Sequence, residues 1–510
     1  MKDFLQDLNE SQREAVLYCD GPAMIIAGAG SGKTRVLTYK IAYLINEIGL
    51  PPYTILALTF TNKAAREMKE RIAGVVGQQV ARQIWMGTFH SIFARILRRE
   101  AEHIGYKSDF TIYDSADTKN LLKTIVREMN LDEKIYKPAA LYSQISNAKN
   151  NLITPQMYKA NAELRRYDSQ VDRPLTGEIY SRYWHRCRSA GAMDSDDLLL
   201  NTNILFRDHP EVLAKYQEMF QYILVDEYQD TNRSQHLIIE LLAKAHNRVC
   251  VVGDDAQSIY AFRGANIANI LNFRSSIPGT KLFKLEQNYR STQTIVNAAN
   301  SLIKKNTEQI AKTVFSKNGV GELLPLRNFL TDYEEAYWVS RQIELVRSDQ
   351  GSAYADFVVL YRTNAQSRVL EEAMRKSGIP YRIYGGLLFY QRKEVKDVVA
   401  YLRLIVNGDD EEAFKRVVNF PKRGIGDTTV GRVAQVASRA GVSFMQVLAD
   451  PIGYGLDVKA AAAGKLRAFR LMIEDFRAKV KEMNAYELVQ HVVRESGIAA
   501  ELPPTARPRG

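Results

Sequence analysis

A glycine-rich loop near the amino terminus contains the residue types that hold phosphate. It occupies residues 27–34, reads Ala-Gly-Ala-Gly-Ser-Gly-Lys-Thr, and lies between an apolar stretch and an amphipathic one. Glycines let backbone amides wrap a phosphate, and the amino terminus of a following helix adds positive potential. We expect Lys33 to reach the β- and γ-phosphates of a nucleotide and the Thr34 hydroxyl to bind magnesium. The strict pattern has glycine at position 27, but the flanking strand and helix patterns disfavour a chance turn. The residues predicted to bind nucleotide in this loop are Ala27, Gly28, Ala29, Gly30, Ser31, Gly32, Lys33, Thr34 and Arg35.

Two adjacent carboxylates supply the acidic element that such a loop needs for hydrolysis. The apolar run 222–225 ends directly at Asp226 and Glu227. Side chains alternate along a strand, so the two carboxylates need not have the same task. Asp226 is placed to hold Mg²⁺, directly or through water, and Glu227 is the natural base for the attacking water. A solvated Asp-Glu pair at a strand end is common, but beside a phosphate loop it makes nucleotide hydrolysis the preferred interpretation.

A third polar segment follows the next predicted strand. Residues 253–260 read Gly-Asp-Asp-Ala-Gln-Ser-Ile-Tyr, and Phe262 comes two positions later. Gln257 can sense the γ-phosphate if its strand lies beside the strand of Asp226. Tyr260 and Phe262 can stack on bases, as aromatic side chains do in single-strand channels. Packing in the core is the alternative for both rings and, by composition alone, the commoner one.

Strands and helices that alternate along the chain must position these residues. Strand patterns are predicted at 23–27, 55–60, 83–86, 222–225, 248–252 and 281–285, and helical patterns follow the first three at 34–46, 63–76 and 89–102. Strand-loop-helix units in series imply a parallel sheet with helices on both faces. Between them strand signals disappear, and polar helices are predicted at 115–129, 177–190 and 194–206. We therefore expect an α/β domain formed by residues 1–106 and 219–285, interrupted by a helical insertion at 107–218.

The second half of the chain repeats this pattern less completely. A second α/β domain is expected to begin at 286–385, with strands near 323–329 and 357–361. A second helical insertion is expected at 386–500, including a helix at 465–483, and a loose tail or abrupt chain end at 501–510. Residues 421–426, Pro-Lys-Arg-Gly-Ile-Gly, resemble the hairpin of a helix-hairpin-helix element, with a plain helix-helix turn as an equal alternative.

Net positive charge is unevenly distributed between the two halves of the chain. Residues 1–280 have a net charge of +2, from 34 basic and 32 acidic residues, whereas residues 281–510 have +9, from 35 and 26. A basic second half suits a phosphate-backbone partner, although many basic proteins bind nothing anionic.

Cys19, Cys187 and Cys250 are far apart, which excludes an obvious zinc ribbon or disulfide framework and suits a reducing cytoplasm. With no apolar run near the roughly 18 residues of a membrane span and no signal peptide, we expect a cytoplasmic protein without membrane association.

Taken together, these motifs resemble those of superfamily 1 helicases of the UvrD/Rep/PcrA type, in order, from about residue 5 to about residue 440. The resemblance implies an α/β fold of P-loop NTPase (RecA-like) parallel-sheet motor domains with inserted all-α subdomains. Alanine at position 27 is usual in this family. Residues 8–12, Leu-Asn-Glu-Ser-Gln, are similar to its adenine-reading motif, which implies that Gln12 hydrogen-bonds the base. Residues 225–230 match its acidic motif, and residues 253–263 match the motif that couples nucleotide to DNA.

The resemblance also implies contacts with single-stranded DNA. Residues 59–65 and 87–91 match segments that touch the strand, while 361–366 and 384–389 resemble second-domain and hinge segments near it. Relatives often have tryptophan in place of Phe262, so we expect weaker stacking there. The DNA-binding residues implied are Phe60, Thr61, Asn62, Thr88, His90, Tyr260, Phe262, Arg263, Arg362 and Asn364.

Residues 287–291, Gln-Asn-Tyr-Arg-Ser, are similar to the motif that opens the family's second motor domain. By that likeness Tyr289 stacks on adenine and Arg290 is an arginine finger on the γ-phosphate. Such a finger accelerates the reaction by orders of magnitude because it neutralises charge developing on the transferring phosphoryl group. A surface salt bridge is the alternative for Arg290, and its place beside Tyr289 disfavours it.

The expected function is ATP-dependent 3′-5′ movement on single-stranded DNA with duplex unwinding. ATP and Mg²⁺ are the implied cofactors, and single-stranded DNA, 3′-tailed duplex DNA and repair or replication proteins are the implied partners. The family's last DNA-binding motif and its Thr-Arg-Ala-like second finger are not found before Gly510, so we expect a fragment or truncated product that hydrolyses and unwinds poorly. A nucleotide-dependent DNA-binding or regulatory protein without unwinding activity is the alternative. A transporter ATPase is disfavoured because its Leu-Ser-Gly-Gly-Gln-type signature is missing, and a small kinase would not carry the DNA-facing segments.

Overall fold

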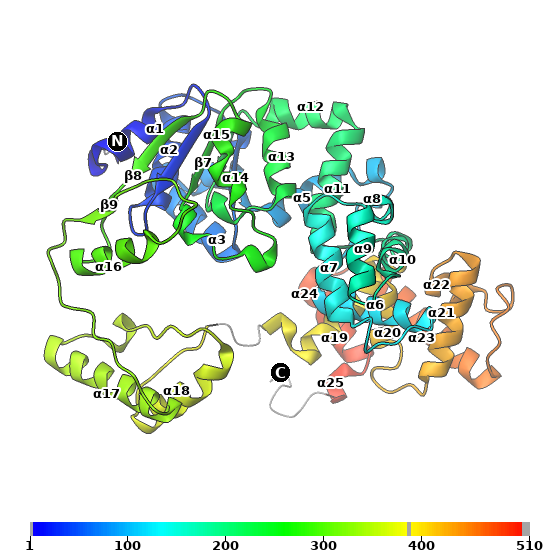
Figure 1. The fold of residues 1–510 in the computed structure, drawn as a ribbon. Helices are drawn as coiled ribbons and strands as arrows, with labels where there is room; N and C mark the ends of the chain where they lie inside the picture. The colour runs from blue at the N-terminus through cyan, green and yellow to red at the C-terminus, as the bar shows by residue number, and fades with distance from the viewer. Residues whose placement is uncertain (1–3, 385–388, 502–510) are drawn as a thin grey trace. The chain divides into compact units, whose positions relative to one another are not determined.

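A six-stranded parallel sheet forms the centre of the first part of the chain. The computed structural model describes residues 4–384 and 389–501. Every neighbouring pair in the sheet is parallel, which confirms the predicted α/β class. The strand order is β3 (Trp85–Thr88), β2 (Ile55–Thr59), β6 (Tyr222–Val225), β7 (Val249–Gly253), β1 (Ala23–Ala27) and β8 (Lys281–Leu285). Figure 1 labels β7 and β8 among these strands. The strand predicted at 83–86 lies slightly later, because residues 78–83 form helix α4 (Gln78–Gln83).

Helices cover both faces of this sheet, because each strand alternates its buried side chains between two cores. In β1, Met24 and Ile26 belong to one hydrophobic cluster, while Ala23, Ile25 and Ala27 belong to the other. The second of these clusters is completed by α1 (Glu10–Leu17), α2 (Lys33–Asn46) and α3 (Asn62–Val76). The first is completed mainly by α5 (Phe89–Arg99), α11 (Ser195–Asp208), α12 (Pro210–Met219), α13 (Arg233–Ala243), α14 (Ala268–Leu271) and α15 (Phe273–Ser276). The loops after the parallel strands all leave from one edge, where ligands bind in open α/β sheets.

The insertion between β3 and β6 is mostly helical, but the prediction that it contains no strands is wrong. Strands β4 (Thr111–Tyr113) and β5 (Ala192–Asp194) form a separate parallel pair. Three residues are too few to show a period-two pattern, so sequence alone could not reveal them. Its remaining helices are α6 (Ser115–Glu128), α7 (Pro138–Asn150), α8 (Pro155–Ala160), α9 (Ala162–Gln170) and α10 (Thr176–Ser189).

After β8 the chain forms short elements that stay with the first sheet. Strand β9 (Gln287–Asn288) pairs with β10 (Phe315–Ser316), and α16 (Gln293–Ile303) lies between them in sequence. Residues Glu322–Val399 form a second compact unit, which contains α17 (Asp332–Gln350) and α18 (Asn364–Lys376).

The strands predicted near 323–329 and 357–361 are not formed in the described part of this second unit. Both segments instead run without regular structure, and several of their apolar side chains are exposed, such as Leu323, Val358 and Leu360. A strand exists only when a neighbouring strand completes its hydrogen-bond ladder, and an apolar pattern cannot report whether that neighbour is present.

From residue 393 the described chain is helical. Its helices are α19 (Lys393–Val406), α20 (Glu411–Val417), α21 (Asp427–Ala440), α22 (Phe444–Ala449), α23 (Ala460–Lys479), α24 (Ala485–Glu495) and α25 (Ile498–Glu501). The helix predicted at 465–483 therefore lies somewhat earlier. Residues 421–426 connect α20 and α21, and the Arg423 guanidinium donates to the carbonyls of Val417 and Ser496. Among the described residues no helix has the length and apolar character needed to span a membrane.

Candidate active site

The phosphate loop lies between β1 and α2, as the sequence predicts. Gly30 and Gly32 adopt left-handed backbone angles, with φ of +69° and +88°, which glycine tolerates best. Gly32 is the residue that precedes α2, and it has no side chain to cap the helix. The amides of the first turn, from Lys33 to Arg35, are therefore available to an anion.

Gln12 lies beside this loop, held there by its own helix. Gln12 and Asn9 form a reciprocal capping box at the start of α1, and the buried Gln12 Nε2 donates to the Ser31 carbonyl over 2.9 Å. The other end of α1 is capped by Lys40 from α2, whose buried ammonium group donates to the carbonyls of Ala15 and Tyr18. Lys40 was missed because nothing in its sequence context distinguishes it from a surface lysine. Asn9 could have been found, since Asn followed three positions later by Gln is a capping-box pattern.

The two predicted carboxylates lie at the end of β6 and have different environments. Asp226 is buried, and its Oδ1 accepts a 3.0 Å hydrogen bond from the Glu227 amide. Burial raises the pKa of Asp226 to about 7, the charge of Glu227 adds to this rise, and Lys33 opposes it. Glu227 has a φ of +50°, a left-handed conformation that is rare outside glycine and tends to occur at functional sites. Its Oε2 lies 2.9 Å from Lys33 Nζ, so the loop lysine and the predicted base form an ion pair.

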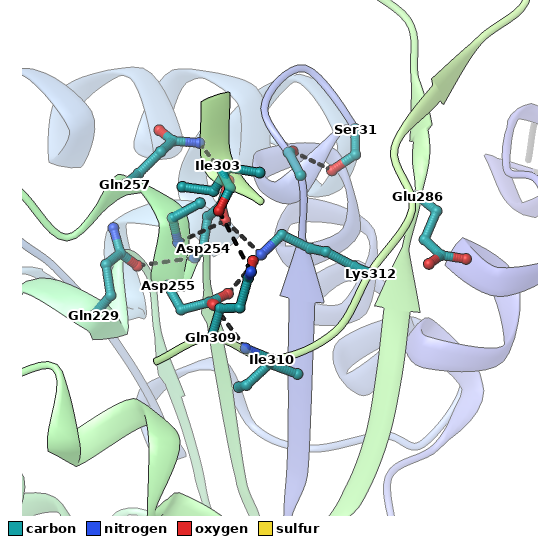
Figure 2. A network of polar contacts seen from close by, with 12 residues as sticks. Ser31, Gln229, Asp254, Asp255, Gln257, Glu286, Ile303, Gln309, Ile310 and Lys312 are labelled. Carbon is teal, nitrogen blue, oxygen red and sulfur yellow. Dashed lines mark hydrogen bonds and ion pairs between the residues drawn. The ribbon is translucent and has the colours of Figure 1, made fainter. Parts of the chain in front are cut away.

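A polar chain extends from this ion pair to Gln257. Gln229 Nε2 donates to Glu227 Oε2 over 2.9 Å, and Gln229 Oε1 accepts from the Asp254 amide over 3.0 Å. Asp254 Oδ2 in turn accepts from Gln257 Nε2 over 2.7 Å (Figure 2). Gln229 was missed by sequence reasoning because its role depends on the adjacency of β6 and β7.

The segment that begins the motif at 287–291 lies against the phosphate loop. Asn288 Nδ2 donates to the Ala29 carbonyl over 2.6 Å, and the Tyr289 amide donates to the Gly30 carbonyl over 2.9 Å. A Cβ atom built on Gly30 would lie 2.9 Å from the Cβ of Arg290. The structure thus brings Tyr289 and the exposed Arg290 beside the loop.

These residues fit a nucleotide with its divalent cation. Asp226 is a buried carboxylate at the strand end, and Thr34 stands in the first turn of α2. The hydroxyl of Thr59, at the end of the neighbouring β2, is buried without a hydrogen-bond partner among the described residues. Oxygen donors of this kind suit Mg²⁺, so Thr34 and Asp226 are the residues that would hold it.

Three predicted DNA-facing aromatic rings lie together. The ring centroids of Phe60 and Tyr260 are 5.3 Å apart, and those of Tyr260 and Phe262 are 5.9 Å apart. Phe262 is 75% exposed, which excludes core packing for this side chain. Phe60 follows β2 and the other two follow β7, so the aromatic trio lies at the same sheet edge as the residues predicted to bind nucleotide.

The other predicted DNA contacts have varied environments. Thr61 and Thr88 cap the amino termini of α3 and α5 with their hydroxyls. Asn62, the first residue of α3, is exposed. Burial lowers the pKa of His90, with Asp194 opposing the shift, so the ring is neutral at pH 7.

Arg263, Arg362 and Asn364 complete the set of predicted DNA-facing residues. Arg263 ends the short turn Ala261–Arg263. Arg362 and Asn364 belong to the second unit, where both are exposed. Of the predicted segment 384–389, residues 385–388 lie outside the described residues.

Comparison with known proteins gives matches along most of the chain. Residues 8–278 match the UvrD/REP helicase N-terminal domain, and residues 283–493 match the UvrD-like helicase C-terminal domain. The chain is 44% identical over 490 residues to the ATP-dependent DNA helicase PcrA of Leuconostoc citreum, covering 96% of this chain and 64% of that relative. It is 45% identical over 497 residues to the protein of the same name from Staphylococcus aureus, covering 98% of this chain and 67% of that relative. The chain thus spans about two thirds of the length of these curated relatives.

Proposed function

Because the chain belongs to the UvrD/REP helicase family, we propose that it is an ATP-dependent 3′-5′ DNA helicase that couples ATP hydrolysis to movement on single-stranded DNA. The observation that carries the proposal is the convergence of Lys33, Glu227 and Arg290 on one phosphate loop. The 3′-5′ direction is taken from the family.

In the proposed mechanism, residues of the loop bind the phosphates and the acidic pair prepares the water. Lys33 and the amides of the first turn of α2 bind the β- and γ-phosphates. Glu227 accepts a proton from the attacking water, and Arg290 neutralises the charge that develops on the γ-phosphate. Mg²⁺, held by Thr34 and Asp226, supplies positive charge to the phosphate oxygens when it is bound.

The ion pair between Lys33 and Glu227 makes binding a precondition of catalysis. While Lys33 Nζ lies 2.9 Å from Glu227 Oε2, the carboxylate is engaged with the lysine. When a triphosphate draws Lys33 toward its oxygens, Glu227 becomes free to accept the proton of water. This exchange limits hydrolysis to the state in which the phosphates are in place.

The same segment that carries Gln257 also carries two rings of the aromatic trio. Only two residues separate Gln257 from Tyr260. A movement of Gln257 that follows the γ-phosphate therefore shifts the rings on which bases stack. This link is the proposed route from hydrolysis to translocation along DNA.

The partners and the compartment follow from the same proposal. Single-stranded DNA and 3′-tailed duplex DNA are the proposed substrates, and repair or replication proteins are proposed partners. The three cysteines are free and buried, which supports a cytoplasmic location where thiols stay reduced.

ATPase and unwinding assays on the 510-residue chain test the proposal. In contrast to the poor hydrolysis and unwinding expected from the motifs alone, the proposal predicts that ATP hydrolysis rises when single-stranded DNA is added. It also predicts that a 3′-tailed duplex is unwound in preference to a 5′-tailed one. The Lys33→Ala variant serves as the inactive control. Hydrolysis stimulated by DNA without any unwinding would favour the alternative of a nucleotide-dependent DNA-binding protein. Hydrolysis that ignores DNA would overturn the proposal.

A further inference from the structure

A loop that follows α16 connects two parts of the nucleotide site. It runs from residue 306 to residue 314, and β10 follows it directly. At its far end Val314 lies over the phosphate loop, since a Cβ built on Gly28 would be 2.6 Å from Val314 Cγ2. Two positions earlier, Lys312 enters the carboxyl edge of β7 and is only 6% exposed. We call residues 306–314 the bridging loop.

Lys312 forms ion pairs with two adjacent carboxylates. Its Nζ lies 3.0 Å from Asp254 Oδ1 and 2.6 Å from Asp255 Oδ1 (Figure 2). Asp255 Oδ2 also accepts a 2.8 Å hydrogen bond from the Ile310 amide, so the bridging loop is fixed to this edge by backbone and side chain. Both carboxylates are buried, and two buried negative charges without a cation would be costly. The positive charge of Lys312 thus compensates the two buried carboxylates.

Asp254 is shared between Lys312 and Gln257. One carboxylate oxygen receives Lys312 Nζ, while the other receives Gln257 Nε2 over 2.7 Å. The position of the carboxylate therefore determines where the Gln257 amide is held. Lys312 pairs with the opposite oxygen of the same carboxylate. A shift of Lys312 would therefore rotate or displace the Asp254 carboxylate, which is the hydrogen-bond partner of Gln257.

Lys312 keeps its positive charge in this buried environment, which maintains its attraction to the carboxylates of Asp254 and Asp255. Burial disfavours its charge, but the hydrogen bond to Asp255 and the charge of Asp254 outweigh this and raise the pKa of Lys312. Lys312 consequently stays charged at physiological pH. The charge of Lys312 therefore does not change with pH near neutrality.

We propose that Lys312 is a positioning residue that, through Asp254, sets the side-chain position of Gln257 and ties this residue to the bridging loop. The proposal rests on the proposed function, in which Gln257 senses the γ-phosphate. The bridging loop contacts the phosphate loop at Val314 and precedes the second unit, which begins at Glu322. Lys312 thereby connects the sensing of the γ-phosphate with the chain segment that leads into that unit.

Nucleotide binding tests the proposal without requiring catalysis. The ratio of the affinities for ATPγS and ADP measures the sensing of the γ-phosphate, and both are obtained by displacement of a fluorescent ADP. Lys312→Met is expected to reduce this ratio by about fivefold to tenfold, a coupling typical of residues in one hydrogen-bond network, while the affinity for ADP changes little. The matched control is Lys305→Met, an exposed lysine near the start of the same loop, which is expected to leave the ratio unchanged.

A double-mutant cycle separates positioning from a purely structural role. If Lys312 acts through Gln257, then Lys312→Met has no further effect on the ratio in a Gln257→Ala background. If the two substitutions reduce the ratio independently, so that their effects add, the proposal is overturned. An equal loss of affinity for both nucleotides would also overturn it, because that outcome indicates general damage to the site.

A second variant covers the case in which Lys312→Met does not fold. Combining Lys312→Met with Asp255→Asn removes one positive and one negative charge, so the net charge of the cluster is kept while Asp254 loses its lysine. The same reduced ratio is expected, and an unchanged ratio in this variant contradicts the proposal.

Failure of the proposed function would be visible separately. A wild-type chain that distinguishes ATPγS from ADP but does not hydrolyse ATP in response to DNA contradicts the helicase assignment and leaves the Lys312 cycle interpretable. A wild-type chain that does not distinguish the two nucleotides overturns the role of Gln257, and the role of Lys312 with it.

Discussion

Lys33 Nζ lies 2.9 Å from Glu227 Oε2, although 194 positions separate the two residues in the chain. The ion pair joins the phosphate loop to the proposed catalytic base across two strands of the sheet that are not neighbours, because β7 lies between β1 and β6. Each of the two residues is thus the electrostatic partner of the other.

Substitution of each partner is expected to have a different effect. Lys33→Ala removes the charge that holds the β- and γ-phosphates, so kcat should fall by at least about 10²-fold and nucleotide affinity should fall as well. Glu227→Gln removes the base but keeps the loop, so hydrolysis should fall by about 10²- to 10⁴-fold while binding is largely kept. Steady-state ATPase assays and fluorescent-nucleotide titrations measure the two quantities. Hydrolysis retained in both variants would refute the site.

Substitution of Gly30 tests the contact between the phosphate loop and the segment of Arg290. In Gly30→Ala the new Cβ would lie 2.9 Å from both Arg290 Cβ and Asn288 Nδ2. Displacement of this segment is expected to lower kcat on the order of 10- to 100-fold, as small misplacements at reacting centres do. Gly49→Ala is the matched control, since Gly49 also has a left-handed φ of +79° but no described atom lies within 4 Å of its new Cβ. Both variants should lose about 1 kcal/mol of stability, and equal kcat values in the two would contradict the proposed contact.

Removal of an exposed ring tests the DNA-facing role of the aromatic trio. Phe262→Ala is expected to weaken binding of single-stranded DNA by about 1 kcal/mol or more, because stacking of a base on an aromatic ring contributes about 1–3 kcal/mol. Fluorescence anisotropy with a labelled oligonucleotide measures the change. Tyr53→Ala is the control, since Tyr53 is 54% exposed and precedes β2, at the opposite edge of the sheet from Phe60. The assignment fails if the two variants bind DNA equally well.

The buried ion cluster of the first helical insertion predicts a dependence of stability on pH. Lys149 Nζ lies 2.6 Å from Asp194 Oδ2 and 2.7 Å from Asp197 Oδ1. Burial, followed by the charge of Asp194, raises the pKa of Asp197 to about 7, whereas an aspartate in the unfolded chain has a pKa of about 3.9. The folded state therefore binds more protons between these values. The contribution of Asp197 to stability is full below about pH 4 and is lost as the pH rises through about 7.

Asp197→Asn is expected to remove this dependence. The stability of the wild type minus that of the variant should fall by on the order of 2–4 kcal/mol between pH 4 and pH 8. Urea unfolding at several pH values, followed by tryptophan fluorescence, measures it; one of the three tryptophans, Trp184, packs against the same helical core. Asp172→Asn, at an exposed position whose φ of +56° suits asparagine, is the control. If the stabilities of the wild type and Asp197→Asn change with pH to the same extent, Asp197 is not the source of the pH dependence.

Much of the candidate site could be predicted because its signals are local. The phosphate loop, the acidic pair after 222–225 and the residues 287–291 each occupy a few consecutive positions next to a strand or helix pattern. The carboxyl ends of parallel strands meet at one edge of a sheet, so motifs that directly follow such strands lie close together.

The tertiary structure alone decided which side chains form pairs. The ion pair of Lys33 with Glu227, the bridge of Gln229 to Asp254 and the link of Lys312 to Asp254 each join segments that lie far apart in the sequence. Their distances depend on strand order and on the path of the bridging loop, which no local pattern specifies. The same reason explains the misjudged strands. The segments 323–329 and 357–361 have apolar patterns but no ladder among the described residues, whereas β4 and β5 pair although each has only three residues, because a strand is defined by its neighbour and not by its own sequence.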